Sequence, residues 1–287
     1  MAASAAWPST KLKPFGLSID RDLSRPISEA DADALRALYS AYKLLLFPRQ
    51  KLSEARQVEV ISLLGDVLTS KGEYREISSD GNLGARPLAY HSDLAFTEEP
   101  FKALSLHALE VNDGESWTAF ANGINAAASL SAALRARIED SDALTVISLT
   151  QSHRDVEFDP PAFLPQQVRP VLMPHPKTGE PILYISEMQT ARIEGYDRRD
   201  SDALLSALFD ALYAESNVYR HFWNNGDFVI WDNLALQHAR CDLTGMVPRR
   251  LQRVAIADKS FFDLCPQFDL GDPRISAWAS GEKLKVS

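Results

Sequence analysis

The sequence contains little cysteine and no long apolar run. Its two cysteines, Cys241 and Cys265, are too few for a disulfide framework, so we expect the reducing environment of the cytoplasm. No segment approaches the roughly 18 consecutive apolar residues that a membrane span requires. The first residues also lack a basic segment followed by an apolar one, which argues against a signal peptide. We therefore expect a soluble, cytoplasmic protein.

Basic residues are scarce relative to acidic ones. The 287-residue chain has 30 Lys and Arg against 39 Asp and Glu, a formal charge of −9. This balance offers no surface for a phosphate backbone, so we expect neither nucleic acid nor a membrane as a partner. Length alone allows one large domain or two small ones. Glycine and proline form no linker, which favours a single domain over 1–287, and whether copies form a homo-oligomer is left open.

Hydrophobic spacing predicts more strands than helices. Helices are expected over 28–42, 53–64, 124–139 and 201–215, where apolar residues recur at helical spacing. With the apolar run 43–47, the segment 15–65 is predicted to pack on the core as helix, strand, helix. Further strands are expected over 90–96, 103–111, 143–150, 171–173, 182–186, 227–231 and 253–257. The absence of regular strand and helix alternation favours an α+β, mainly β fold: a sandwich or barrel with helices outside.

Two polar stretches interrupt these elements. Residues 66–89 are broken by glycine and proline, and residues 153–170 are polar and rich in proline. Both are predicted to be loops and are candidate lids over a bound molecule. Tyr74, Arg86 and Tyr90 are the residues in the first stretch and at its end that we expect to contact such a molecule.

Three residues form a candidate metal site. His91 and Asp93 are two apart, and on an extended strand they would point to the same side. His238 follows an apolar strand and the turn-forming pair Asp232-Asn233, which is also close enough in sequence to hydrogen-bond an imidazole. Two histidines and one carboxylate leave coordination positions open, as in non-haem Fe(II) oxygenases.

An arginine cluster lies downstream of His238. Between Leu236 and Asp258 there are four arginines against two aspartates, so positive charge is concentrated locally in an acidic chain. On an extended strand Arg249 and Arg253 share a face while Arg250 points away. The planar guanidinium suits a carboxylate, which predicts a pocket for an acidic molecule.

These residues occur in the order found in one known family. The chain resembles the taurine and 2,4-dichlorophenoxyacetate dioxygenase family of Fe(II)/2-oxoglutarate-dependent oxygenases. The segments His91-Ser-Asp93 and Trp231-Asp-Asn with His238 resemble its two metal motifs, and the likeness runs from about residue 15 to residue 258, through 175–179, 183–185 and 192–195. The resemblance implies a double-stranded β-helix (jelly-roll, cupin-like) core with flanking helices.

The resemblance also implies roles for individual residues. His91, Asp93 and His238 would bind Fe(II), while Thr118 and Arg249 would hold the co-substrate 2-oxoglutarate. Arg253 stands where members place an arginine near the anionic group of the substrate or near the iron-bound carboxylate. The chain departs from the family pattern at Glu115-Ser116-Trp117 and at Leu234, and it has Gln189 where relatives often have an aromatic residue facing the substrate.

The implied activity is an oxidation that uses O2. Oxidative decarboxylation of 2-oxoglutarate to succinate and CO2 would be coupled to hydroxylation, or to related C–H oxidation such as desaturation, of a small-molecule substrate. Arg253 leads us to expect an anionic organic or amino-acid-like compound. Two alternatives use the same three ligands without 2-oxoglutarate: a metal-dependent isomerase or hydrolase, and a non-catalytic metal-binding sensor.

Overall fold

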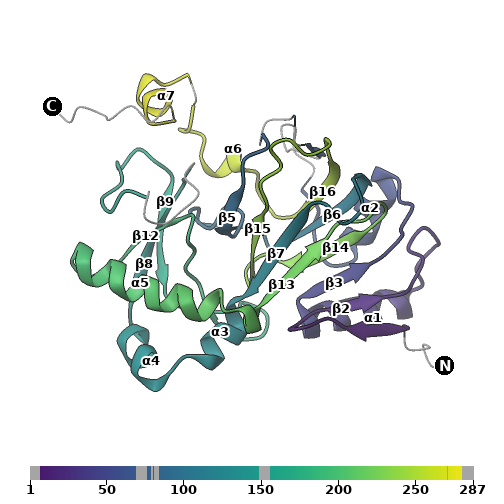
Figure 1. The fold of residues 1–287 in the computed structure, drawn as a ribbon, viewed down its shortest axis with the longest axis horizontal. Coiled ribbons are helices and arrows are strands. Elements are labelled where there is room, and N and C mark those ends of the chain that lie inside the picture. The colour runs from purple at the N-terminus through teal and green to yellow at the C-terminus, as the bar shows by residue number, and fades with distance from the viewer. Residues whose placement is uncertain are drawn as a thin grey trace.

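The structure is a computed structural model that describes residues 7–68, 76–78, 80, 84–148, 156–269 and 271–279. Strands outnumber helices in this part of the chain, and nearly all paired strands are antiparallel (Figure 1). The prediction of a mixed, mainly β protein is therefore confirmed. In the same ranges, no helix is both long and apolar enough to cross a membrane.

The larger sheet has seven strands, in the order β1-β2-β3-β14-β6-β16-β4. Only the β2–β3 pair is parallel. Its strands are β1 (Ser9–Lys11), β2 (Leu17–Ile19), β3 (Leu44–Phe47), β14 (Phe228–Asp232), β6 (Ala103–Glu110), β16 (Arg250–Ile256) and β4 (Glu76–Ser78).

A second, four-stranded sheet carries most of the candidate site residues. Its order is β13-β7-β15-β5, and every pair is antiparallel. The strands are β13 (Val218–Phe222), β7 (Trp117–Asn122), β15 (Leu236–Arg240) and β5 (Leu88–His91).

Alternating side chains on the central strands build two apolar layers. On β14, Val229 and Trp231 join a cluster that also contains Phe120 of β7 and Leu236 of β15, so this cluster lies between the two sheets. Phe228 and Ile230 point the other way and join a second cluster with the helices α1 and α2. Burial on both faces explains why β14 reads as a continuous apolar run.

The N-terminal helix, strand and helix were predicted correctly. Helix α1 (Glu29–Tyr42) begins after Ser28, whose hydroxyl accepts from the backbone N–H of Asp31, and α2 (Glu54–Ser62) begins after Ser53 in the same way. Such N-caps satisfy backbone N–H groups that have no partner within the helix. Both helices pack on the outer face of the seven-stranded sheet (Figure 1).

Several of the other elements pack on the four-stranded sheet. A three-stranded sheet contains β12 (Thr190–Ile193), β8 (Asp142–Val146) and β9 (Gln166–Pro170), and a two-stranded one contains β10 (Leu172–Pro174) and β11 (Pro181–Leu183). Helix α5 (Arg198–Leu212) packs there through Leu204, Leu205 and Leu208. The remaining helices are α3 (Gly123–Ser129), α4 (Ala132–Ile138), the short 3-10 helix Glu215–Asn217, α6 (Phe261–Leu264) and α7 (Pro273–Ala279).

Several boundaries were predicted wrongly. The helix expected over 124–139 is divided, because Leu130 adopts an extended conformation and Ser131 caps a new helix. The 66–89 stretch is not wholly a loop, since β4 pairs with β16 and Val67 bridges to Ile256. The 153–170 stretch contains β9, which pairs along its whole length with β8. The strand expected over 90–96 ends at His91.

Candidate metal centre

Two paired strands bring His91 and His238 together. In the β5–β15 ladder these residues are direct partners, and their ring centroids lie 4.2 Å apart. His91 is the last residue of β5, and its Nδ1–H donates to the carbonyl oxygen of Ala89 at 2.8 Å. That bond leaves Nε2 with a free lone pair, the form in which histidine binds a metal.

Asp93 reaches the two imidazoles from a turn and not from a strand. It lies two residues beyond β5, before Leu94 with a positive φ of 59°, so the predicted pairing of side chains along a strand was wrong in its geometry. Its Oδ1 nevertheless lies 3.4 Å from Nε2 of His91 and 3.6 Å from Nε2 of His238. One ligand atom from each residue falls within 4.8 Å of the others.

The protonation states suit metal binding. Burial alone would raise the pKa of Asp93, but the Arg253 guanidinium and the two nearby imidazoles outweigh it and hold that pKa far below its usual range. Burial, with the nearby His91 and Arg253, lowers the pKa of His238 to about 3. At neutral pH the centre therefore offers a neutral imidazole beside a carboxylate anion.

Arg253 contacts the candidate metal ligand Asp93. Its Nη2 donates to Asp93 Oδ2 at 2.6 Å, and its guanidinium lies over the ring of Phe101, 5.2 Å from the centroid. Because Arg253 contacts Oδ2, the other oxygen, Oδ1, is the one that faces both imidazoles. Arg250 points outward, as predicted, and it pairs there with Glu76.

Thr118 and Arg249, the residues expected to hold 2-oxoglutarate, are both buried. Thr118, on β7, accepts a hydrogen bond from the indole Nε1–H of Trp223 at 3.0 Å. Arg249 directly precedes β16, and its Nη1 donates to Ser116 Oγ at 3.3 Å. The structure thus places Arg249 beside the β7 end that carries Thr118.

A second buried arginine, Arg240, was not predicted as a site residue. It is the ladder partner of Thr118, and it lowers the pKa of Arg249, which burial and this neighbouring charge together bring to about 10. Its Nη2 donates to the carbonyl oxygens of Gly84 and Arg86. Arg240 is two residues after His238 on a strand, so strand periodicity could have identified it.

The residues predicted to contact substrate differ in how deeply they are buried and in how close they lie to the metal ligands. Tyr90 is half-buried next to His91 and stacks on Tyr213 with ring centroids 4.2 Å apart. Gln189 is buried, and its Oε1 accepts from the backbone N–H of Ser92 at 3.4 Å. Arg86 is exposed, and Tyr74 lies outside the described residues.

The donor set fits a divalent iron ion. Two imidazole nitrogens and one carboxylate oxygen converge from one side, and this is the ligand set by which non-haem oxygenases bind Fe(II) while keeping positions open. A structural zinc site would use four protein ligands, usually histidine and cysteine. The cluster His91, Asp93 and His238 is the one group of this kind found among the described residues.

Comparison with known proteins agrees with this class. The family model described as "Taurine catabolism dioxygenase TauD, TfdA family" matches residues 8–255. The chain is 28% identical over 252 residues to an α-ketoglutarate-dependent sulfate ester dioxygenase of Pseudomonas putida, covering 82% of this chain and 83% of that protein. It is also 28% identical over 225 residues to an (S)-phenoxypropionate/α-ketoglutarate dioxygenase of Sphingobium herbicidovorans, covering 71% and 78%.

The chain therefore belongs to the TauD, TfdA family. It is an oxidoreductase, an Fe(II)- and 2-oxoglutarate-dependent dioxygenase that uses O2, as the motifs predicted. The crystal structure of a taurine dioxygenase from Burkholderia xenovorans has the same fold, with a TM-score of 0.75 at 22% identity, covering 89% of this chain and 92% of that one.

Proposed function

We propose that His91, Asp93 and His238 hold the Fe(II) of this dioxygenase. The convergence of their three ligand atoms carries the proposal, supported by the neutral His238 and the ionised Asp93. When bound, the metal with 2-oxoglutarate and O2 supplies the oxidation of a substrate C–H bond, with succinate and CO2 as co-products. The protein contributes the orientation of the ligands and a buried surrounding.

Arg249 and Thr118 bind the distal carboxylate of 2-oxoglutarate in this proposal. A guanidinium can make two parallel hydrogen bonds to a carboxylate, and the Thr118 hydroxyl can add a third. Burial and the neighbouring Arg240 disfavour the charged form of Arg249, so a dianion in this place would relieve the repulsion between the two arginines. The same two charges would favour an anion over a neutral molecule of similar shape.

In this proposal the substrate side of the pocket is formed by Arg253, Tyr90 and Gln189, with Arg86 as a contact from the 66–89 stretch. Tyr74, also expected to contact the substrate, lies outside the described residues. A small anionic substrate fits Arg253, whose guanidinium lies beside the metal ligands. The names of two relatives, a sulfate ester dioxygenase and a phenoxypropionate dioxygenase, both refer to anionic substrates. We propose a small organic anion of this kind, and hydroxylation or a related C–H oxidation as the outcome.

The arrangement of the two main sheets supports a jelly-roll core. They are antiparallel apart from one pair, they enclose a common apolar layer, and the two proposed histidine ligands are paired across β5 and β15 of the four-stranded sheet. We accordingly propose one double-stranded β-helix domain over 1–287, with helices packed outside. Of the two stretches expected to act as lids, we propose that the described residues 84–87 and 156–165 border the substrate; residues 69–75, 79, 81–83 and 153–155 lie outside the described residues.

A succinate assay tests this function. Purified protein is incubated in air with Fe(II), ascorbate, 2-oxoglutarate and a panel that includes an alkyl sulfate and a phenoxypropionate. We expect Fe-dependent succinate with at least one compound, and none from His238→Ala. An isomerase, a hydrolase or a metal-binding sensor would yield no succinate with any of them.

Arg249 distinguishes the oxygenase from those alternatives. Arg249→Ala should raise the KM for 2-oxoglutarate on the order of 10- to 100-fold, because a hydrogen bond to a charged group contributes about 1.5–3 kcal/mol. Arg250→Ala is the matched control, since Arg250 is the next residue but pairs with Glu76 on the outside. Equal KM values for the two variants would contradict the assignment.

A further inference from the structure

The side chain of Asn233 holds the backbone of Asp93. Its Oδ1 accepts from the Asp93 N–H at 2.9 Å, and its Nδ2 donates to the carbonyl oxygens of Asp93 at 3.0 Å and Phe101 at 2.8 Å. Asp93 follows β5 and so has no strand partner for these two backbone groups. An amide is the side chain that offers the required acceptor and donor together, and Asn233 is completely buried.

The position of Asn233 depends in turn on Asp232. One carboxylate oxygen of Asp232, Oδ1, accepts from the backbone N–H groups of Leu234 at 3.1 Å and Ala235 at 3.0 Å. These bonds close the turn between β14 and β15, in which Asn233 lies. Strand β15 begins at Leu236, directly after Ala235, and carries His238. The same turn therefore determines where the His238 imidazole lies.

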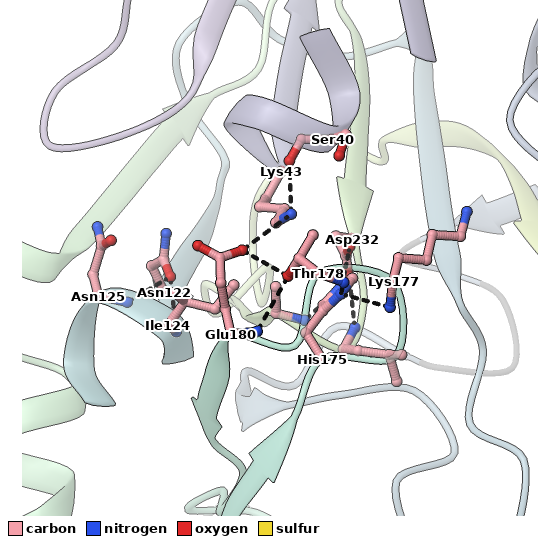
Figure 2. Close-up of polar contacts among 12 residues, drawn as sticks. Ser40, Lys43, Asn122, Ile124, Asn125, His175, Lys177, Thr178, Glu180 and Asp232 are labelled. Atoms are coloured by element: carbon pink, nitrogen blue, oxygen red, sulfur yellow. Dashed lines mark hydrogen bonds and ion pairs between the residues drawn. The ribbon is translucent and has the colours of Figure 1, made fainter. Parts of the chain in front are cut away.

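The other oxygen of Asp232, Oδ2, is held by His175 at 2.9 Å. The Nδ1 of His175 accepts from the backbone N–H groups of Lys177 and Thr178, each at 3.2 Å. Since Nδ1 is an acceptor, the ring hydrogen must be on Nε2, where it donates to Asp232. Figure 2 shows His175 between Asp232 and the backbone of the 177–178 turn.

The loop that presents His175 is itself braced. The backbone N–H of His175 donates to the carbonyl oxygen of Glu180 at 2.8 Å, and the Glu180 carboxylate accepts from the Thr178 hydroxyl at 2.7 Å and lies 3.7 Å from the ammonium of Lys43 (Figure 2). The carbonyl oxygen of Lys43 accepts from the Asp232 N–H at 2.9 Å. Lys43 thus links the two residues: its ammonium lies near Glu180 of the loop that presents His175, and its carbonyl oxygen binds the backbone of Asp232.

We propose that His175, Asp232 and Asn233 form a positioning relay for the metal centre. The relay fixes the backbone of Asp93, so that its Oδ1 faces His91 and His238, and it fixes the start of β15. In this proposal His175, which is not a candidate ligand, acts on the centre through Asp232. The inference rests on the proposed metal site and assigns these three residues a role in metal affinity without direct contact with the metal.

Metal affinity separates positioning from simple stabilisation. Asn233→Ala is compared with Asn217→Ala, because Asn217 is also buried and also donates through Nδ2 to two carbonyl oxygens, those of Asn122 and Leu212. Both variants lose two bonds donated by Nδ2, and Asn233→Ala also loses the bond accepted by Oδ1, so both should lower the free energy of unfolding. Only Asn233→Ala should raise the Kd for Co(II), on the order of 10- to 100-fold as is typical for partners of metal ligands. Only this variant should also change the Co(II) absorption spectrum.

His175 offers a milder variant in case Asn233→Ala fails to fold. His175→Asn keeps an acceptor for the N–H groups of Lys177 and Thr178 but removes the donor to Asp232, and His175→Gln retains a donor of similar reach. We expect weaker Co(II) binding in His175→Asn and partial recovery in His175→Gln.

The outcomes for the relay and for the metal site can be told apart. Wild-type protein should bind Co(II), and His238→Ala should not. If wild type binds no Co(II), the proposed metal site and the proposed relay are both refuted. If wild type binds Co(II) and neither the Asn233 nor the His175 variants change its Kd or spectrum, the metal site stands and the relay is refuted.

Discussion

Arg253 donates from Nη2 to Asp93 Oδ2 at 2.6 Å, so the carboxylate proposed to bind iron already has one oxygen engaged by a guanidinium. This contact leaves Oδ1 as the oxygen directed at the two imidazoles. The sequence left open whether Arg253 serves the substrate or the carboxylate ligand. In the structure the guanidinium contacts the carboxylate directly, and its position beside the centre also allows it to face a substrate anion.

Replacement of Arg253 tests this contact. Arg253→Met removes the donor while keeping part of the apolar stem, and Asp93 then loses the bond that orients it. We expect the Kd for Mn(II) in the absence of any substrate to increase about tenfold, at the low end for a partner of a metal ligand. Arg250→Met is the control. Unchanged Mn(II) affinity with a raised substrate KM would instead make Arg253 a substrate residue alone.

Thr118 is predicted to have two separable roles. Thr118→Val leaves the buried Nε1–H of Trp223 without its acceptor, which should lower the free energy of unfolding by about 1–3 kcal/mol. The same change should raise the KM for 2-oxoglutarate. Thr118→Ser retains the hydroxyl and should preserve both properties, as measured by urea denaturation and by succinate formation. A Thr118→Ser variant that behaves like Thr118→Val would point to packing of the methyl group as the cause.

The sequence was most informative where local signals are strong. Helices α1 and α2 have Ser28 and Ser53 as caps and one apolar face each, and both were predicted. Strand β15 was not, because its polar residues Gln237, His238 and Arg240 hide the pattern of a buried strand. In β15, residues used for binding thus replace residues used for packing and weaken the strand pattern.

The candidate ligands were predicted, but not what holds them in place. His91, Asp93 and His238 were singled out by residue type and order, and the structure brings them together. The Asp232-Asn233 pair was expected to form a turn or to hydrogen-bond an imidazole. It does form the turn; Asp232 accepts from the imidazole of His175, which is not a candidate ligand, and Asn233 binds the backbone of Asp93. Such a contact joins residues 140 positions apart, and no local pattern reveals it.

Gly226 should be intolerant of a side chain. It has a φ of +82°, and a Cβ there would lie 2.7 Å from the carbonyl oxygen of Gln50. A non-glycine residue in this backbone region costs on the order of 1–3 kcal/mol before any clash. Gly114→Ala is the control, because Gly114 has a φ of +75° but open space around its Cβ. We expect Gly226→Ala to lower the free energy of unfolding in urea more than Gly114→Ala does.

His107 should make the fold sensitive to acid. Burial lowers its pKa, against the opposing effect of the hydrogen bond from its Nε2 to the carbonyl oxygen of Gln50. Below a pH of about 6.5, the ordinary histidine pKa, the unfolded chain takes up a proton that the folded chain resists, so the free energy of unfolding falls as pH falls. His107→Gln keeps a donor toward Gln50 but does not titrate. Between pH 7.5 and pH 5.5, urea denaturation should therefore show a smaller loss of stability in His107→Gln than in wild type, and equal losses would show that His107 is protonated as readily in the folded protein as in the unfolded chain.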